Sequence, residues 1–190
     1  MKKIILFRGA VETLAFFSNE LQNAFIQMGY ETFVFDISQP LESFNGLLEF
    51  CKKGEAVAVT FNFIGLSGEP IFNDSGNNFF DVYKIKCINI VVDHPFYYHQ
   101  NLHALPHDYI QFCIDQTHIA YMKRFFKNVR LGPFLPLAGT MFQKSNPPLP
   151  IRNHEKIDII FTGNYTPLSL YEKQITRIND EYTNFYRGII

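Results

Sequence analysis

The chain lacks tryptophan and has only three cysteines in 190 residues. Cys51, Cys87 and Cys113 are odd in number and none belongs to a Cys-x-x-Cys pair, which argues against a disulfide framework and predicts a reducing compartment. Cys87 and Cys113 fall within apolar runs, where a thiol packs as a small hydrophobic group. A cysteine nucleophile therefore has little support.

An excess of charge is also missing, because the formal net charge is −1 and the pI is about 6.6. The chain has no basic surplus or polybasic run, which argues against nucleic-acid and anionic-membrane partners. No apolar run reaches the ~20 residues of a transmembrane helix. Arg8 also interrupts the first apolar run too early for a signal peptide. We expect a cytoplasmic protein, and no edge or coiled-coil pattern predicts its oligomeric state.

Three fingerprints of nucleotide or hydrolase chemistry are absent. The sequence has no Gly-x-Gly-x-x-Gly and no Gly-x-x-x-x-Gly-Lys-[Ser/Thr], which argues against a classical dinucleotide site and a P-loop. It has no Gly-x-Ser-x-Gly, so a serine nucleophile is poorly supported. We therefore predict no resident cofactor.

The chain does contain alternating strand and helix patterns. Residues 3–8 predict a buried strand, and Thr13 is a suitable N-cap for a helix that runs to about Met28. A second strand is predicted over 31–37, so the first two strands should be parallel. The same patterns predict helices over 40–53, 78–84 and 116–127, a short helix or turn over 95–106, and strands over 55–63, 86–93, 108–114 and 129–135.

This alternation predicts an α/β, Rossmann-like fold with a mostly parallel sheet flanked by helices. Residues 1–137 form its main domain. Residues 138–155 contain three prolines and little periodicity, which indicates a linker. A further strand at 156–162 and a helical pattern at 168–187 follow. Residues 156–190 therefore either begin a second Rossmann-like domain or fold back onto the first.

The richest polar cluster follows the strand predicted over 86–93. In open α/β sheets, ligands bind outside the carboxyl ends of the strands. Asp93 and His94 put a carboxylate beside an imidazole there, which suits a general base, and they are the catalytic candidates. Tyr97 and His99 are candidate substrate contacts. In the alternative interpretation, Asp93 and His94 only satisfy backbone groups of the loop.

Other strand ends supply further candidate substrate contacts. A glycine turn follows the first strand, polar residues and glycines follow the third, and a polar pair precedes the helix over 116–127. The residues are Arg8, Gly9, Asn62, Gly65, Asp115 and Gln116. Asp115 could instead be an ordinary N-cap.

The histidines at 99, 103 and 107 recur every fourth residue, a spacing that metal ligands on a helix can adopt. Pro106 should end any helix before His107, and no cysteine or glutamate has a matching offset. A polar surface helix is the favoured interpretation, so no metal site is predicted. A pair of histidines binding a metal remains a lesser hypothesis.

The layout resembles the N-terminal half and domain junction of GT-B glycosyltransferases, including the family 1-like enzymes. The resemblance rests on Asp115-Gln116, Val129-Arg-Leu-Gly-Pro-Phe-Leu-Pro136, the proline-rich hinge and Ile157-Asp-Ile-Ile-Phe-Thr-Gly-Asn164. The spore-maturation CgeB-like enzymes are the most similar subgroup, with an Asp-Pro-type strand end where this chain has Asp93-His94-Pro95.

This resemblance implies sugar transfer from a nucleotide-sugar donor, the substrate, to a small-molecule or glycan acceptor. Asp93 or His94 would be the base, and Gly163 and Asn164 would form a turn for the donor phosphates. The second domain of the family supplies most donor contacts, so residues 1–190 alone are expected to be inactive. The alternative is a non-enzymatic, flavodoxin-like module that binds a small ligand or partner.

Overall fold

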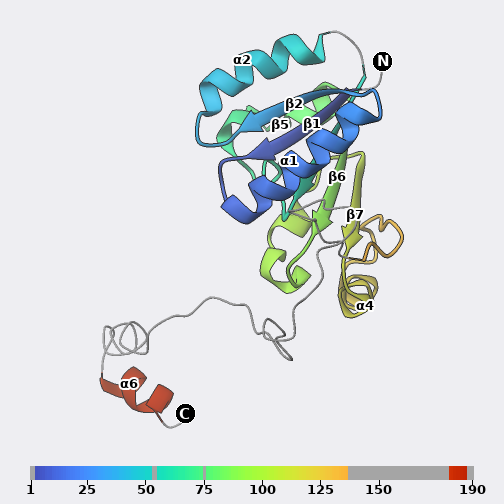
Figure 1. The fold of residues 1–190 in the computed structure, drawn as a ribbon. Helices are drawn as coiled ribbons and strands as arrows, with labels where there is room; N and C mark the ends of the chain where they lie inside the picture. Colours follow the sequence, from blue (N-terminus) through green and yellow to red (C-terminus); the bar gives the residue numbers. More distant parts are fainter. Residues whose placement is uncertain (1–2, 53–54, 75, 137–179, 188–190) are drawn as a thin grey trace, which may run out of the picture. The chain divides into compact units, whose positions relative to one another are not determined.

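The computed structural model describes residues 3–52, 55–74, 76–136 and 180–187 (Figure 1). The chain divides into two units, residues 1–139 and 140–190. The second unit is described only through helix α6, Asp180–Arg187, which lies within the helix predicted over 168–187. The predicted linker, the strand predicted over 156–162, Gly163 and Asn164 lie outside the described residues.

The first unit is built on a parallel sheet of five strands, in the order β2-β1-β3-β6-β7. The strands are β1 (Lys3–Arg8), β2 (Glu31–Asp36), β3 (Ala56–Phe61), β6 (Lys86–Val91) and β7 (Tyr109–Cys113). Every pairing within the sheet is parallel, which confirms the predicted α/β, Rossmann-like fold. The order is that of flavodoxin-like folds, in which the connections reverse direction between β1 and β3.

Helices and short turns connect the strands. The α-helices are α1 (Glu12–Gln27), α2 (Pro40–Cys51), α3 (Phe79–Val82) and α4 (Gln116–Phe125), and the 3-10 turns are η1 (Pro70–Phe72), η2 (Pro95–Tyr98) and η3 (Asn101–His103). A small antiparallel hairpin, β4 (Asn73–Asp74) and β5 (Asn77–Asn78), precedes α3. None of these described helices is both long and apolar enough to cross a membrane.

The two faces of the sheet are packed differently. Helix α1 lies along one face, where Leu21 and Phe25 pack against Ile4 and Leu6 of β1 (Figure 1). The other face carries a larger core, rich in phenylalanine. Buried rings from β1, β2, η1 and α3 contact one another there: Phe7, Phe35, Phe72, Phe79 and Phe80. This core fixes the carboxyl edge of the sheet relative to the helices.

The prediction of a strand over 129–135 is wrong, because these residues form no regular strand. Its pairing with β7 is an isolated bridge between Gln111 and Leu131. The Gly132 N–H donates to the Gln111 carbonyl, and the Leu135 N–H donates to the Cys113 carbonyl. Pro133 lies between these donors and has no N–H, so the ladder is interrupted there.

Other predicted elements differ in detail. Helix α1 begins after Val11, which has no capping group, so the prediction of Thr13 as N-cap is wrong. Residues 78–84 contain the single turn α3, which the Asn78 side chain caps by accepting from the Phe80 N–H. Residues 95–106 form two 3-10 turns. A histidine face on one continuous helix therefore does not exist.

Candidate functional site

The carboxyl ends of β3 and β6 are joined by the side chain of Asn62. After β3, Asn62 and Phe63 both have left-handed backbones, with φ of 47° and 64°. Asparagine tolerates this conformation, whereas it is unfavourable for phenylalanine. The Phe63 N–H donates to Oδ1 of buried Asn89, at 3.1 Å, and the Phe63 ring is fully buried. Core contacts thus hold the turn that presents Asn62.

Asn62 in turn positions Asp93. Its Nδ2 donates to Asp93 Oδ2 at 2.9 Å, and its Oδ1 accepts from the Val92 N–H at 2.9 Å. The Tyr98 hydroxyl also donates to Asp93 Oδ2, at 2.9 Å. Asp93 itself is exposed. The site therefore presents to solvent a carboxylate that two side chains orient through one of its oxygens.

Tyr98 acts as a hydrogen-bond donor in this arrangement. Burial raises the pKa of its hydroxyl above the usual range, and the hydrogen bond to Asp93 and the negative charge of that residue raise it further. The Tyr98 ring packs against Phe63, with centroids 5.1 Å apart. The hydroxyl consequently remains protonated at neutral pH and keeps donating to the carboxylate.

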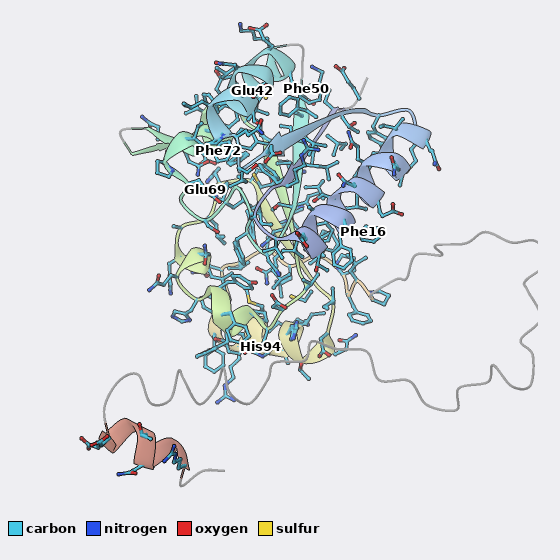
Figure 2. The ribbon with its side chains drawn as sticks, turned by 60° about the vertical axis from the view of Figure 1, so that its left-hand side comes forward. Phe16, Glu42, Phe50, Glu69, Phe72 and His94 are labelled. Atoms are coloured by element: carbon cyan, nitrogen blue, oxygen red, sulfur yellow. The ribbon has the colours of Figure 1, made fainter. Side chains whose placement is uncertain are left out.

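His94 is adjacent to Asp93 but makes different contacts. Its Nδ1 accepts from the Phe96 N–H at 3.1 Å, which caps η2. A neutral imidazole in that bond carries its proton on Nε2, so His94 is arranged as a donor. Its ring packs edge-on against His118 and Tyr121 of α4, with centroids 4.9 and 5.0 Å apart. Figure 2 shows His94 at the end of the first unit.

His118 lies in the polar group that follows β7 with Asp115 and Gln116, but it was not one of the predicted site residues. Its Nδ1 is buried and has no hydrogen-bond partner in the described part of the chain. Burial lowers the pKa of His118, and the charge of His94 lowers it further, whereas Asp115 and Asp93 oppose the shift. A neutral imidazole with a buried, unpartnered nitrogen therefore lies against His94. The sequence could have pointed to His118, because this residue follows the end of a predicted strand.

The predicted contacts after β1 form an ion pair. Arg8 Nε donates to Asp36 Oδ2 at 3.0 Å, and the Arg8 side chain is half exposed. The pKa of Asp36 is lowered, mainly by the hydrogen bond from the Ser38 hydroxyl. Gly9 has φ of 93°, and a Cβ there would collide with the Asp36 carboxylate and the Ser38 backbone. Arg8 and Gly9 thus both lie against the residues that end and follow β2, and their contact with a substrate stays a prediction.

The loop after β3 is organised by its own residues. Gly65 and Ser67 both donate their N–H groups to the Glu69 carboxylate, at 2.8 Å each. Gly65 has φ of 80°, and a Cβ at this position would overlap the Phe7 ring. The loop after β3 is therefore a structured turn that packs on the core, and contact of Gly65 with a substrate stays a prediction.

The remaining predicted contacts are exposed. Asp115 caps α4, since its Oδ1 accepts from the Thr117 N–H and hydroxyl at 2.6 and 2.5 Å, which confirms the N-cap interpretation. These bonds lower the pKa of Asp115. Gln116 begins α4 and is exposed. Tyr97 is 75% exposed. Its contact with a substrate stays a prediction.

The cysteines behave as the sequence predicts. Cys51, Cys87 and Cys113 are free thiols. Burial raises the pKa of each, which disfavours the nucleophilic thiolate.

A buried polar network behind the site was not predicted. Asn89 and Gln111, both fully buried, are paired on adjacent strands. The Tyr109 hydroxyl accepts from Asn89 at 2.9 Å and donates to Gln111 at 3.0 Å. The sequence contained a clue to this network, because each of two apolar strand patterns includes one polar residue, Asn89 or Gln111. Through Phe63, this network connects the core to the turn that carries Asn62.

No family model matches the chain, and no curated protein matches its sequence. The case for a function therefore rests on the residues at the carboxyl edge of the sheet.

Proposed function

We propose that the first unit is the acceptor-side domain of a GT-B-type glycosyltransferase. The observation that carries this proposal is the exposed Asp93 carboxylate, which Asn62 and Tyr98 orient at the carboxyl edge of a parallel sheet. Ligands of open α/β sheets bind at this edge. The resemblance in layout supplies the reaction class, and the strand-end carboxylate supplies a group that could act in it.

In the proposed reaction, a hydroxyl of the acceptor attacks the anomeric carbon of the donor sugar. The bond from that carbon to the nucleoside diphosphate breaks, and the new glycosidic bond forms. Asp93 accepts the proton that the hydroxyl loses. His94 would orient the acceptor, because its free ring nitrogen is a donor when the imidazole is neutral. Tyr97, which is exposed, would contact the sugar.

The donor side of the proposal rests on the resemblance. Gly163 and Asn164 would form the turn for the donor phosphates, and the nucleotide sugar is a substrate, with no resident cofactor. We expect the reaction to occur in the cytoplasm, where the three free thiols would stay reduced.

The test combines calorimetry with a transfer assay on a form of the protein that carries a complete second domain, because residues 1–190 alone are expected to be inactive. We expect a nucleotide sugar to bind, and release of nucleoside diphosphate to depend on a glycan acceptor. Asp93→Asn should lower turnover by about 10²–10⁴-fold, the usual contribution of a general base. Donor affinity should be unchanged, because the base contacts the acceptor. Absence of binding for every nucleotide sugar, or full turnover by Asp93→Asn, would reject the proposal.

The strand order favours one alternative function. In flavodoxin-like sheets the ligand lies where the connections reverse direction, here between β1 and β3. A non-enzymatic module would bind a small anionic ligand there through Arg8. Nucleotide binding that is lost in Arg8→Gln, retained in Asp93→Asn and accompanied by no turnover would favour this alternative.

A further inference from the structure

Two exposed histidines lie close together where the two 3-10 turns meet. His99 follows η2, and His103 ends η3. Their Nε2 atoms are 3.4 Å apart. Both rings pack against buried Phe126, with centroids 5.1 and 5.6 Å from its ring. The fold of the loop, and not a helix face, therefore brings these side chains together.

The separation of the two nitrogens fits a shared metal ion. Without a metal, this distance is that of a long hydrogen bond between the two rings, since the usual distance from a nitrogen donor to its acceptor is about 2.9–3.0 Å. Two imidazole nitrogens, each about 2.1 Å from one zinc ion at a tetrahedral angle, lie about 3.4 Å apart. At the right angle of a square or octahedral complex, the same bond lengths place them about 3.0 Å apart. The observed 3.4 Å therefore matches the tetrahedral case.

We propose that His99 and His103 chelate a zinc ion through their Nε2 atoms. The contact of both rings with Phe126 orients them in advance, which reduces the entropy lost on binding. No third histidine, cysteine, aspartate or glutamate joins them in the described ranges. His107, the third histidine of the sequence pattern, follows Pro106 and is tied by its backbone N–H to Asp81. Water or an exogenous ligand completes the coordination.

A calorimetric titration of tag-free protein with zinc chloride tests the proposal. We expect one ion bound per chain through this pair. His99→Gln and His103→Gln should each weaken binding by at least tenfold, because each removes one of two protein ligands. His107→Gln is the matched control and should bind as the wild type does. Zinc binding that is absent in the wild type, or unchanged in both variants, would overturn the proposal.

Two further measurements separate metal loss from misfolding and check the geometry. Circular dichroism and metal-free thermal unfolding should be alike for the wild type and the His99→Gln and His103→Gln variants, since both side chains are exposed. If one variant is unfolded, the other decides the question. Cobalt substitution should give the intense visible bands of a tetrahedral complex, and these should disappear in each folded variant. Weak octahedral bands would contradict the tetrahedral site.

Discussion

Asn62 Nδ2 lies 2.9 Å from Asp93 Oδ2, although the two residues are 31 positions apart in the chain. Strands β3 and β6 are neighbours in the sheet, with Phe61 paired to Ile90, so their ends reach the same edge. Asn62 continues this pairing with its side chain, because its amide binds both the Val92 backbone and the Asp93 carboxylate. One residue thus links the end of the sheet to the proposed base.

The backbone and side-chain roles of Asn62 can be separated. Asn62→Gly keeps the φ of 47° accessible but deletes the amide, whereas Asn62→Ala also forces a Cβ into the left-handed region. We expect Asn62→Ala to be less stable than Asn62→Gly by about 1 kcal/mol in urea unfolding. In the proposed reaction, both should reduce turnover, since both remove one of the two hydrogen bonds that orient Asp93. Equal stability of the two variants would show that the turn relaxes.

Gly65 and Gly68 provide a matched pair in one loop. Both have φ near 80°, at 80° and 82°. A Cβ at Gly65 would meet the Phe7 ring, while a Cβ at Gly68 would meet nothing within 4 Å. Gly65→Ala should therefore lower the free energy of unfolding by about 1–3 kcal/mol more than Gly68→Ala does, the usual cost of overpacking. Denaturant unfolding of the two variants measures the difference, and equal losses would mean that Phe7 moves aside.

Asn89 should matter for stability more than an exposed asparagine does. Asn89→Leu leaves the buried Phe63 N–H without its acceptor and removes a donor to Tyr109. An unsatisfied buried group costs about 1–3 kcal/mol, so we expect a loss of about 2 kcal/mol in the free energy of unfolding. The control is Asn128→Leu, at an exposed position, with an expected change within about 0.5 kcal/mol. Similar losses in both variants would contradict the role of the network.

His118 should make folding stability depend on pH. The pKa of this imidazole is lowered in the folded protein from an ordinary value of 6.5. The unfolded chain then binds more protons, so stability falls as the pH decreases from about 7 through the folded pKa. His118→Gln should show a shallower fall between about pH 7 and pH 5. Chemical unfolding across this range measures it, and parallel curves for the two proteins would refute the prediction.

At higher pH the same two proteins provide an internal control. Above about pH 8 the imidazole is neutral in both the folded and unfolded states, so its contribution no longer changes with pH. The curves for the wild type and His118→Gln should therefore run parallel there, whatever their difference in stability. A slope difference that persists above pH 8 would have to come from another group.

Local pattern was enough to predict most of the sheet. Apolar runs bounded by turn residues located five strands within one or two residues of their ends, because strand formation depends on burial of a short stretch. The polar clusters at 62 and 93 were recognisable for the same reason, since each follows such a run. The prediction of a strand over 129–135 was wrong because Pro133 interrupts the hydrogen-bond ladder to β7. This effect depends on the pairing with β7 and not on the local pattern.

The sequence by itself determined where the strands end and which polar residues follow them, because those features depend on neighbours along the chain. Only the tertiary structure decided which strand ends meet. The bond from Asn62 to Asp93, the packing of His94 on His118 and the approach of His99 to His103 all depend on strand order and turn geometry. Such contacts arise when distant segments of the chain pack together. The spacing of apolar residues along one segment does not predict them. The tertiary structure thus decided that Asp93 is an oriented carboxylate and that His99 and His103 form a pair.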